Sequence, residues 1–206
     1  LEVVGANDPL PMFAAMAAST RHLGLVPTMS TTFLPPRLLA QAMGTLDHMS
    51  AGRSGMNLVT SVGDYIAQNY GLDELPQAGE RYDRADKFVE EIEGLWANAD
   101  PDDPGDGLAM PPLPQGKPVV MQAGGSDRGR QFAAQHAEII IAHIQTVEAA
   151  RDFRNDLRGR MKAIGRDPDS CKIFYTIKPM LAETREEAEA LYEKMKRRPA
   201  LSTESG

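Results

Sequence analysis

Residues 117–142 read KPVVMQAGGSDRGRQFAAQHAEIIIA, and this stretch decides the fold. An apolar run is followed by two glycines and a serine, and a segment with helical spacing then leads into a second apolar run. The pattern predicts a strand over 117–123, a helix over 128–137 and a strand over 138–144. A helix between two apolar strands is typical of a βαβ unit, in which the two strands run parallel.

The same alternation of strand and helix extends along the chain in both directions. Apolar runs bounded by turn residues predict further strands over 23–32, 55–61 and 171–181. Apolar residues at helical spacing predict helices over 11–22, 37–50, 81–96, 147–165 and 184–198. Five strands that alternate with helices define the α/β class with a parallel sheet. Because a complete (β/α)8 barrel typically needs about 250 residues, the chain is either a smaller open sheet or an incomplete barrel.

The chain is expected to form a single domain over residues 1–206. The polar segment 98–116, rich in Pro, Gly and Asp, is the one plausible site of a loop insertion, and a plain solvated loop is the alternative interpretation. The sequence begins without a methionine and ends without an obvious terminal element, so we expect a piece of a longer protein.

Composition excludes several classes of protein. The 206 residues carry a formal net charge of −7, which disfavours a surface for nucleic acid or for an anionic membrane. A single cysteine, Cys171, excludes an intrachain disulfide, fits a reducing cytoplasm and is expected to be buried beside an apolar run. No apolar run reaches the length of a membrane span, so we expect a cytoplasmic protein.

Ligands of parallel α/β folds bind at the C-terminal ends of the strands. The residues expected there are Thr28, Met29, Ser30, Thr31, Asn57, Thr60, Ser61, Ala123 to Ser126, His143 and Lys178. This set is rich in hydroxyls and nearly free of carboxylates, so the acid pairs of glycoside or phosphate-ester hydrolysis are missing. The histidines lack metal-ligand spacing and no GxSxG elbow occurs, so neither a metal nor a catalytic side chain is predicted. The set suits a phosphorylated cofactor that brings its own reactivity.

The turn at Gly125, Ser126 and Asp127 has two interpretations. It is either a tight connection from strand to helix or an anion site. The N–H groups at a helix start have no partner within the helix, and the helix dipole is positive there, so they bind phosphate without a cationic side chain.

Two stretches carry a resemblance to a known family: LDHMSAGRSGMNLVTS at 46–61 and QAGGSDRGR at 122–130. Together they resemble the luciferase-like, FMN-dependent monooxygenases, and within them the branch that includes nitrilotriacetate, EDTA and dibenzothiophene-sulfone monooxygenases. The resemblance runs from about Pro9 to beyond Ile173. It implies a (β/α)8 TIM barrel of which this chain holds the central part, without the first and last strands.

The resemblance also implies an activity. Reduced FMN (FMNH2) would come from a separate NAD(P)H-dependent flavin reductase, and O2 would add at the flavin C4a position. The resulting peroxyflavin would oxidise a small organic substrate, such as a compound with a C–N or C–S bond. A homo-oligomer is expected as well.

By matching residues to the family's motifs, the resemblance implies six cofactor-binding positions. Gly125 and Ser126 would hold the phosphate, which favours the anion-site interpretation of the turn. Thr28 and Ser30 would face the isoalloxazine ring, and Asn57 would lie near the flavin; local hydrogen bonding at strand ends is the alternative role for all three.

The sixth position, Tyr82, belongs to the family's H-x-x-x-Y pattern, but here Ala78 stands in place of the histidine. Met56 stands where the family often has tryptophan. Met56 would change the shape of the pocket. Ala78 and the missing strands favour a second reading, a truncated flavin-binding or interaction protein without turnover. An open-sheet α/β enzyme with another phosphate ligand is a third.

Overall fold

The computed structural model describes residues 8–177 and 179–196, and it has the expected alternation of strands and helices. Contacts divide the chain into two units, Leu1–Tyr175 and Thr176–Gly206, so the expectation of one domain over 1–206 stays a prediction. The strands of the first unit are β1 (Thr28–Ser30), β2 (Gly55–Val59), β3 (Val119–Gln122), β4 (Ile139–Ala142) and β5 (Lys172–Tyr175). Its helices are α1 (Pro9–Ser19), α2 (Pro36–Ser50), α3 (Asp64–Gln68), α4 (Ala78–Ala97), α5 (Asp127–His136) and α6 (Val147–Ala163). The second unit contains α7 (Arg185–Lys196).

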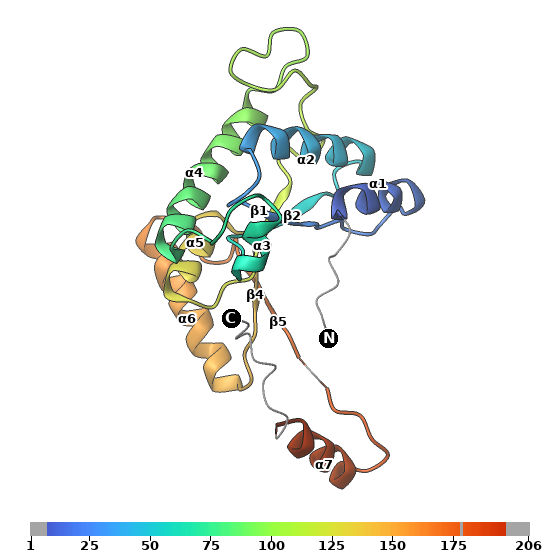
Figure 1. The fold of residues 1–206 in the computed structure, drawn as a ribbon, viewed down its shortest axis with the longest axis vertical. Helices are drawn as coiled ribbons and strands as arrows, with labels where there is room; N and C mark the ends of the chain where they lie inside the picture. The colour runs from blue at the N-terminus through green and yellow to red at the C-terminus, as the bar shows by residue number, and fades with distance from the viewer. Residues whose placement is uncertain (1–7, 178, 197–206) are drawn as a thin grey trace. The chain divides into compact units, whose positions relative to one another are not determined.

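The five strands form one parallel sheet in the order β1-β2-β3-β4-β5 (Figure 1). Each strand therefore pairs with the strands that precede and follow it in the chain, and helices supply the crossovers. All parallel C-terminal ends meet at one edge of the sheet, which is where a ligand site is expected.

Side chains alternate between the two faces of the sheet. Met29, Leu58, Val120 and Ile140 are buried on the face that the helices cover, because successive residues of a strand point to opposite sides. Asn57 precedes Leu58 in β2 and lies on the other face, together with its register partners Thr28 and Met121.

Most deviations from the expected elements occur at strand ends. The expected strand over 23–32 is reduced to β1, with Leu25 forming only an isolated bridge to Ser54. The expected strand over 171–181 is reduced to β5. The short helix α3 was not expected, since five residues are too few to show helical periodicity.

The expected helix over 81–96 begins at Ala78 as part of α4. The expected helix over 184–198 corresponds to α7, and its last two residues lie outside the described part of the chain, as does Lys178.

The LDHMSAGRSG motif has a structural role at the start of β2. Asp47 is fully buried and accepts hydrogen bonds from the Ser54 hydroxyl, at 2.8 Å, and from the side-chain amide of Gln115. Gln115 also donates to the Ser54 carbonyl at 2.8 Å. One carboxylate thus joins α2, β2 and the end of the long connection before β3.

Arg53 of the same motif fixes the segment between α1 and β1. Its guanidinium donates to the carbonyls of Ala17, Thr20, Leu23 and Ser50 at 2.6–3.1 Å. Five N–H groups in a rigid fork suit this arrangement, and the ammonium of lysine cannot reproduce it.

Candidate functional site

A cavity of about 400 Å³ lies at the C-terminal ends of β2 and β3. Its polar lining residues are Thr60, Ser61, Arg81, Tyr82, Gln122 and Ser126. Leu58, Val62 and Ile66 contribute apolar surface. The wall thus combines strand ends with the first turns of α4 and α5, in the position where parallel α/β folds bind ligands.

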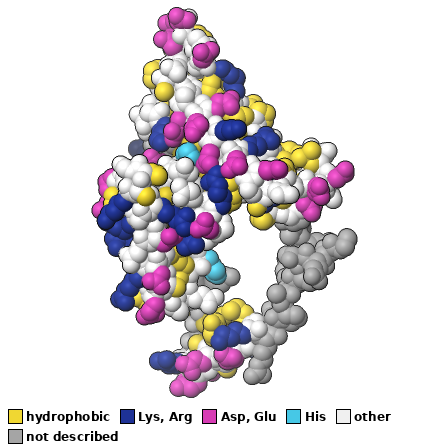
Figure 2. Space-filling model, turned by 90° about the vertical axis from the view of Figure 1, so that its left-hand side faces the viewer, with side chains coloured by type: hydrophobic (Ala, Val, Ile, Leu, Met, Phe, Trp, Pro, Cys, Tyr) yellow, Lys and Arg dark blue, Asp and Glu magenta, His cyan; other side chains and the backbone are white. Residues whose placement is uncertain are grey.

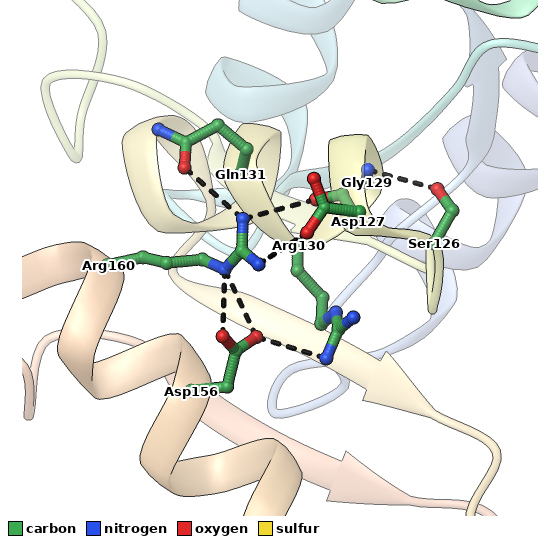
Figure 3. Close-up of polar contacts among 7 residues, drawn as sticks. All are labelled: Ser126, Asp127, Gly129, Arg130, Gln131, Asp156 and Arg160. Atoms are coloured by element: carbon green, nitrogen blue, oxygen red, sulfur yellow. Dashed lines mark hydrogen bonds and ion pairs between the residues drawn. The ribbon is translucent and has the colours of Figure 1, made fainter.

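Ser126 caps α5 and defines one end of the cavity. Its Oγ accepts a hydrogen bond from the N–H of Gly129 at 3.1 Å, so the serine occupies the N-cap position (Figure 3). The remaining N–H groups of the first turn have no partner within the helix. This geometry is suited to an anion, as the sequence predicts for Ser126. Gly125, in the turn before the cap, is exposed and is not among the residues that line the cavity.

The acidic residue at the start of α5 is paired with α6. Asp127 accepts a hydrogen bond from Arg160 at 2.6 Å, and both oxygens of Asp156 accept from Arg160 Nε at 3.1 Å (Figure 3). The hydrogen bond from Arg160, followed by its charge, holds the pKa of Asp127 below its ordinary value. The positive charge of Arg160 offsets the carboxylate, which would otherwise repel an anion at this helix start.

Tyr82 reaches the same helix start from α4. A Cβ atom on Gly129 would lie 2.8 Å from the Tyr82 hydroxyl and 3.0 Å from the Ser126 hydroxyl. The Arg128 guanidinium lies 5.5 Å from the centre of the Tyr82 ring and pairs with Asp83 and Asp86. The structure therefore brings the predicted Tyr82 and Ser126 together.

Two lining residues, Arg81 and Gln122, were missed by the sequence analysis. Arg81 donates through Nη1 to the Pro76 carbonyl, and its Nε is buried without a hydrogen bond in the described structure. Gln122 ends β3, and its Oε1 is likewise buried and unpaired. The available signals were weak: Arg81 directly precedes Tyr82, and Gln122 begins QAGGS.

The other predicted site residues form two hydroxyl and amide pairs. Ser30 Oγ lies 2.8 Å from the hydroxyl of the cavity residue Ser61, and Asn57 donates to Thr28 Oγ1 at 3.1 Å. Asn57 Oδ1 is buried without a partner. Ser61 has φ of 61°, a left-handed conformation that is uncommon for serine and is often found at functional sites. Thr28, Ser30 and Asn57 do not line the cavity itself, and Ser61 links Ser30 to it.

Ion pairs join some of the charged side chains outside the cavity, such as Lys117 with Glu93 and Arg185 with Glu189. On the face in Figure 2, Lys and Arg side chains are interspersed with Asp and Glu. Within residues 8–177 and 179–196, no group of three or more His, Cys, Asp or Glu residues could hold a metal ion. In the same residues, no helix is long and apolar enough to cross a membrane.

The site has the hydrogen-bond donors and acceptors that a phosphorylated, hydroxyl-bearing cofactor such as FMN requires. Free N–H groups at α5 and the Arg81 guanidinium suit a phosphate. The unpaired Oε1 of the cavity residue Gln122 suits a hydroxyl or ring N–H group, because buried acceptors are normally paired. Asn57 Oδ1 is a second unpaired acceptor, on the other face of β2 and outside the cavity. Ala78 lies at the cavity wall and supplies no such group, so the histidine expected from the family pattern has no replacement at its own position.

Comparison with known proteins identifies the class. The sequence model for the family described as "Luciferase-like monooxygenase" matches residues 2–203, and the chain belongs to this family. The chain is 37% identical to dibenzothiophene-sulfone monooxygenase of Rhodococcus erythropolis over 87% of its own length and 46% of that protein. It is 34% identical to nitrilotriacetate monooxygenase component A of Aminobacter aminovorans, over 90% and 47% of the two chains. The family resemblance in the sequence is thereby confirmed.

Solved structures give the same result for the fold. The crystal structure of riboflavin lyase (RcaE), with modified FMN and riboflavin, matches with a TM-score of 0.81 and 32% identity, over 93% of this chain and 49% of that one. The chain thus has the α/β fold of luciferase-like TIM-barrel monooxygenases, and its five strands correspond to part of the barrel. It spans about half the length of the curated relatives it matches.

Proposed function

We propose that this chain is the cofactor-binding part of a flavin-dependent monooxygenase that uses FMNH2 and O2. The observation that carries the proposal is the cavity between β2, β3 and the capped start of α5, in a chain of this family. A small organic substrate, such as one with a C–N or C–S bond, fits the relatives' names. A separate NAD(P)H-dependent reductase as the source of FMNH2 is part of the proposal, and the name "component A" of one relative supports it. The homo-oligomer and the cytoplasmic location stay predictions.

The residues of the chain have distinct tasks under this proposal. The α5 start with Gly125 and Ser126, together with Arg81, holds the phosphate. Tyr82 adds a hydrogen bond from the neighbouring helix.

Hydroxyl and amide groups of Ser30, at the end of β1, and of Thr28 and Asn57, which pair further down β1 and β2, orient the ring. The apolar wall at Val62 and Ile66 excludes water. When bound, the reduced flavin supplies the two electrons with which O2 delivers one oxygen atom to the substrate and one to water.

One observation favours a second candidate. Ala78 lines the cavity at the position of the family histidine, which removes a polar group from the wall. A flavin-binding or interaction protein without turnover is therefore the alternative. The two candidates differ after the flavin has bound, because only the monooxygenase gives oxygen-dependent product formation with a reductase present.

The test is anaerobic titration with FMNH2, and then mixing with O2. The Ser126→Asp variant should bind FMNH2 at least tenfold more weakly, because a carboxylate would face the phosphate while aspartate still caps the helix. Thr146→Asp is the matched control, since Thr146 caps α6 in the same way, through Ala149 N at 3.2 Å, and does not line the cavity. Equal affinities of the wild type and Ser126→Asp would contradict the proposed phosphate site.

A further inference from the structure

Gln122, like Arg81, is a cavity residue with a buried polar atom that has no hydrogen-bond partner in the described structure. It occupies the last position of β3, has an exposed fraction of only 4%, and lines the cavity. The unpaired atom of Gln122 is Oε1. Leaving a buried acceptor unpaired destabilises the free protein, and native structures contain few such groups without a functional reason.

The turn after β3 accommodates this side chain. A Cβ atom on Gly124 would lie 2.1 Å from Gln122 Nε2 and 3.0 Å from the side-chain carbonyl carbon. Any larger residue at position 124 would therefore displace the carboxamide. The absence of a side chain at position 124 leaves room for the carboxamide on the wall of the cavity.

The surroundings of Gln122 determine which ligand group it can accept. The start of α5 at Ser126 and the Arg81 guanidinium favour an anion in the same cavity. An unpaired acceptor oxygen repels phosphate oxygens, so it requires a donor. The nearest donors in a phosphate ester are hydroxyl groups on the chain that carries the phosphate.

We propose that Gln122 is a specificity-determining residue that accepts a hydrogen bond from such a hydroxyl. The cavity would then select phosphate esters with a polyhydroxy chain over esters with a bare alkyl chain. This inference rests on the proposed function insofar as the ligand is FMNH2, whose ribityl chain carries these hydroxyls.

The experiment compares two pairs of probes under anaerobic conditions. The first pair is FMNH2 and a reduced flavin with a pentyl phosphate chain in place of ribityl phosphate. The second pair is ribitol 5-phosphate and pentyl phosphate, which lack the flavin ring. The wild type should prefer the hydroxylated member of each pair. Gln122→Met should weaken the binding of the hydroxylated probes about three- to tenfold, as expected for the loss of one hydrogen bond. The affinity for the two pentyl probes should not change.

Two further variants separate binding from folding. Gly124→Ala should reduce the same preference, because its Cβ displaces the carboxamide without removing it. Gln41→Met carries the matched substitution at an exposed position of α2 and should bind like the wild type. Because Oε1 is unpaired in the free protein, Gln122→Met should not lower Tm.

Each outcome has a defined meaning. Equal weakening of hydroxylated and pentyl probes by Gln122→Met would overturn the inference and assign Gln122 to the phosphate or to the fold. A Gln122-dependent preference for ribitol 5-phosphate without FMNH2 binding would overturn the proposed function and uphold the inference. Absence of binding to all four probes would overturn both.

Discussion

The hydroxyl of Tyr82 on α4 lies where a Cβ atom on Gly129 of α5 would be only 2.8 Å away. Ordinary Cβ contacts are longer than this, so the two helices come together here only because residue 129 is glycine. The approach places the Tyr82 and Ser126 hydroxyls around one point at the start of α5, on the wall of the cavity. Gly129 thus contributes to the site because it has no side chain that would keep the two hydroxyls apart from α5.

Substitution of this glycine should therefore affect binding more than folding. Gly129→Ala should weaken FMNH2 binding about tenfold by displacing the Tyr82 and Ser126 hydroxyls, measured by anaerobic titration. Gly94→Ala is the control, because Gly94 lies in α4 with nothing within 4 Å of its Cβ position. The control should gain about 1 kcal/mol in unfolding free energy from helix propensity and keep its affinity. Similar behaviour of the two variants would contradict the role of the close approach.

Tyr82→Phe tests the hydroxyl alone. Loss of one neutral hydrogen bond should raise the Kd for FMNH2 about fivefold, equivalent to about 1 kcal/mol. Tyr70→Phe is the control, because Tyr70 is exposed and stacks on Phe33 with ring centres 4.3 Å apart. An unchanged Kd for Tyr82→Phe would leave Tyr82 with a packing role against Phe132.

Asp47→Ala should destabilise the fold without affecting the cavity. The substitution leaves the buried Ser54 hydroxyl without its acceptor and removes one of the acceptors of the Gln115 amide, which should lower the free energy of unfolding in urea by about 3 kcal/mol. The exposed Asp73 provides the control, since Asp73→Ala should change this free energy by no more than about 0.5 kcal/mol. A change as small for Asp47→Ala would show that the buried network does not stabilise the protein.

The ion pair between Asp127 and Arg160 predicts a dependence of stability on pH. Because Arg160 lowers the pKa of Asp127, the pair stabilises the fold above the ordinary carboxyl value of 3.8. This contribution is lost as the pH falls through the lower pKa of the folded state. The difference in unfolding free energy between the wild type and Asp127→Asn should therefore be larger at pH 6 than at pH 3. Asp152→Asn, at an exposed position of α6, should show no such trend.

Local sequence was sufficient to predict the central part of the fold. The helix expected over 128–137 is α5, and the strands on either side of it are β3 and β4. The signals that predict α5, the cap at Ser126 and the apolar periodicity after it, both lie within a few neighbouring residues of the sequence. The length of β1 was not predicted, because the end of a strand depends on pairing with β2, which lies beyond α2 in the chain.

The site was predicted where a strand end or a family motif indicated it. Thr60 and Ser61 were expected at the end of a strand, Ser126 and Tyr82 were expected from the family motifs, and all four line the cavity. Arg81 and Gln122 were not expected, since they lie on different elements, α4 and β3, and line one cavity only in the folded chain. The same holds for Gly129, whose missing Cβ matters only against a residue of another helix.

The order β1-β2-β3-β4-β5 also has a consequence for folding kinetics. Neighbouring strands of the sheet are neighbours in the chain, but the intervening segments differ greatly in length. Only α5 and short turns separate β3 from β4, whereas α3, α4 and the connection 98–116 separate β2 from β3. Loop closure costs less entropy for the shorter segment, so β3 and β4 should pair early around α5. The N-terminus of α5, where we propose that the phosphate binds, would then belong to the part of the chain that folds first. The residues of α4 that line the cavity would pack against it later.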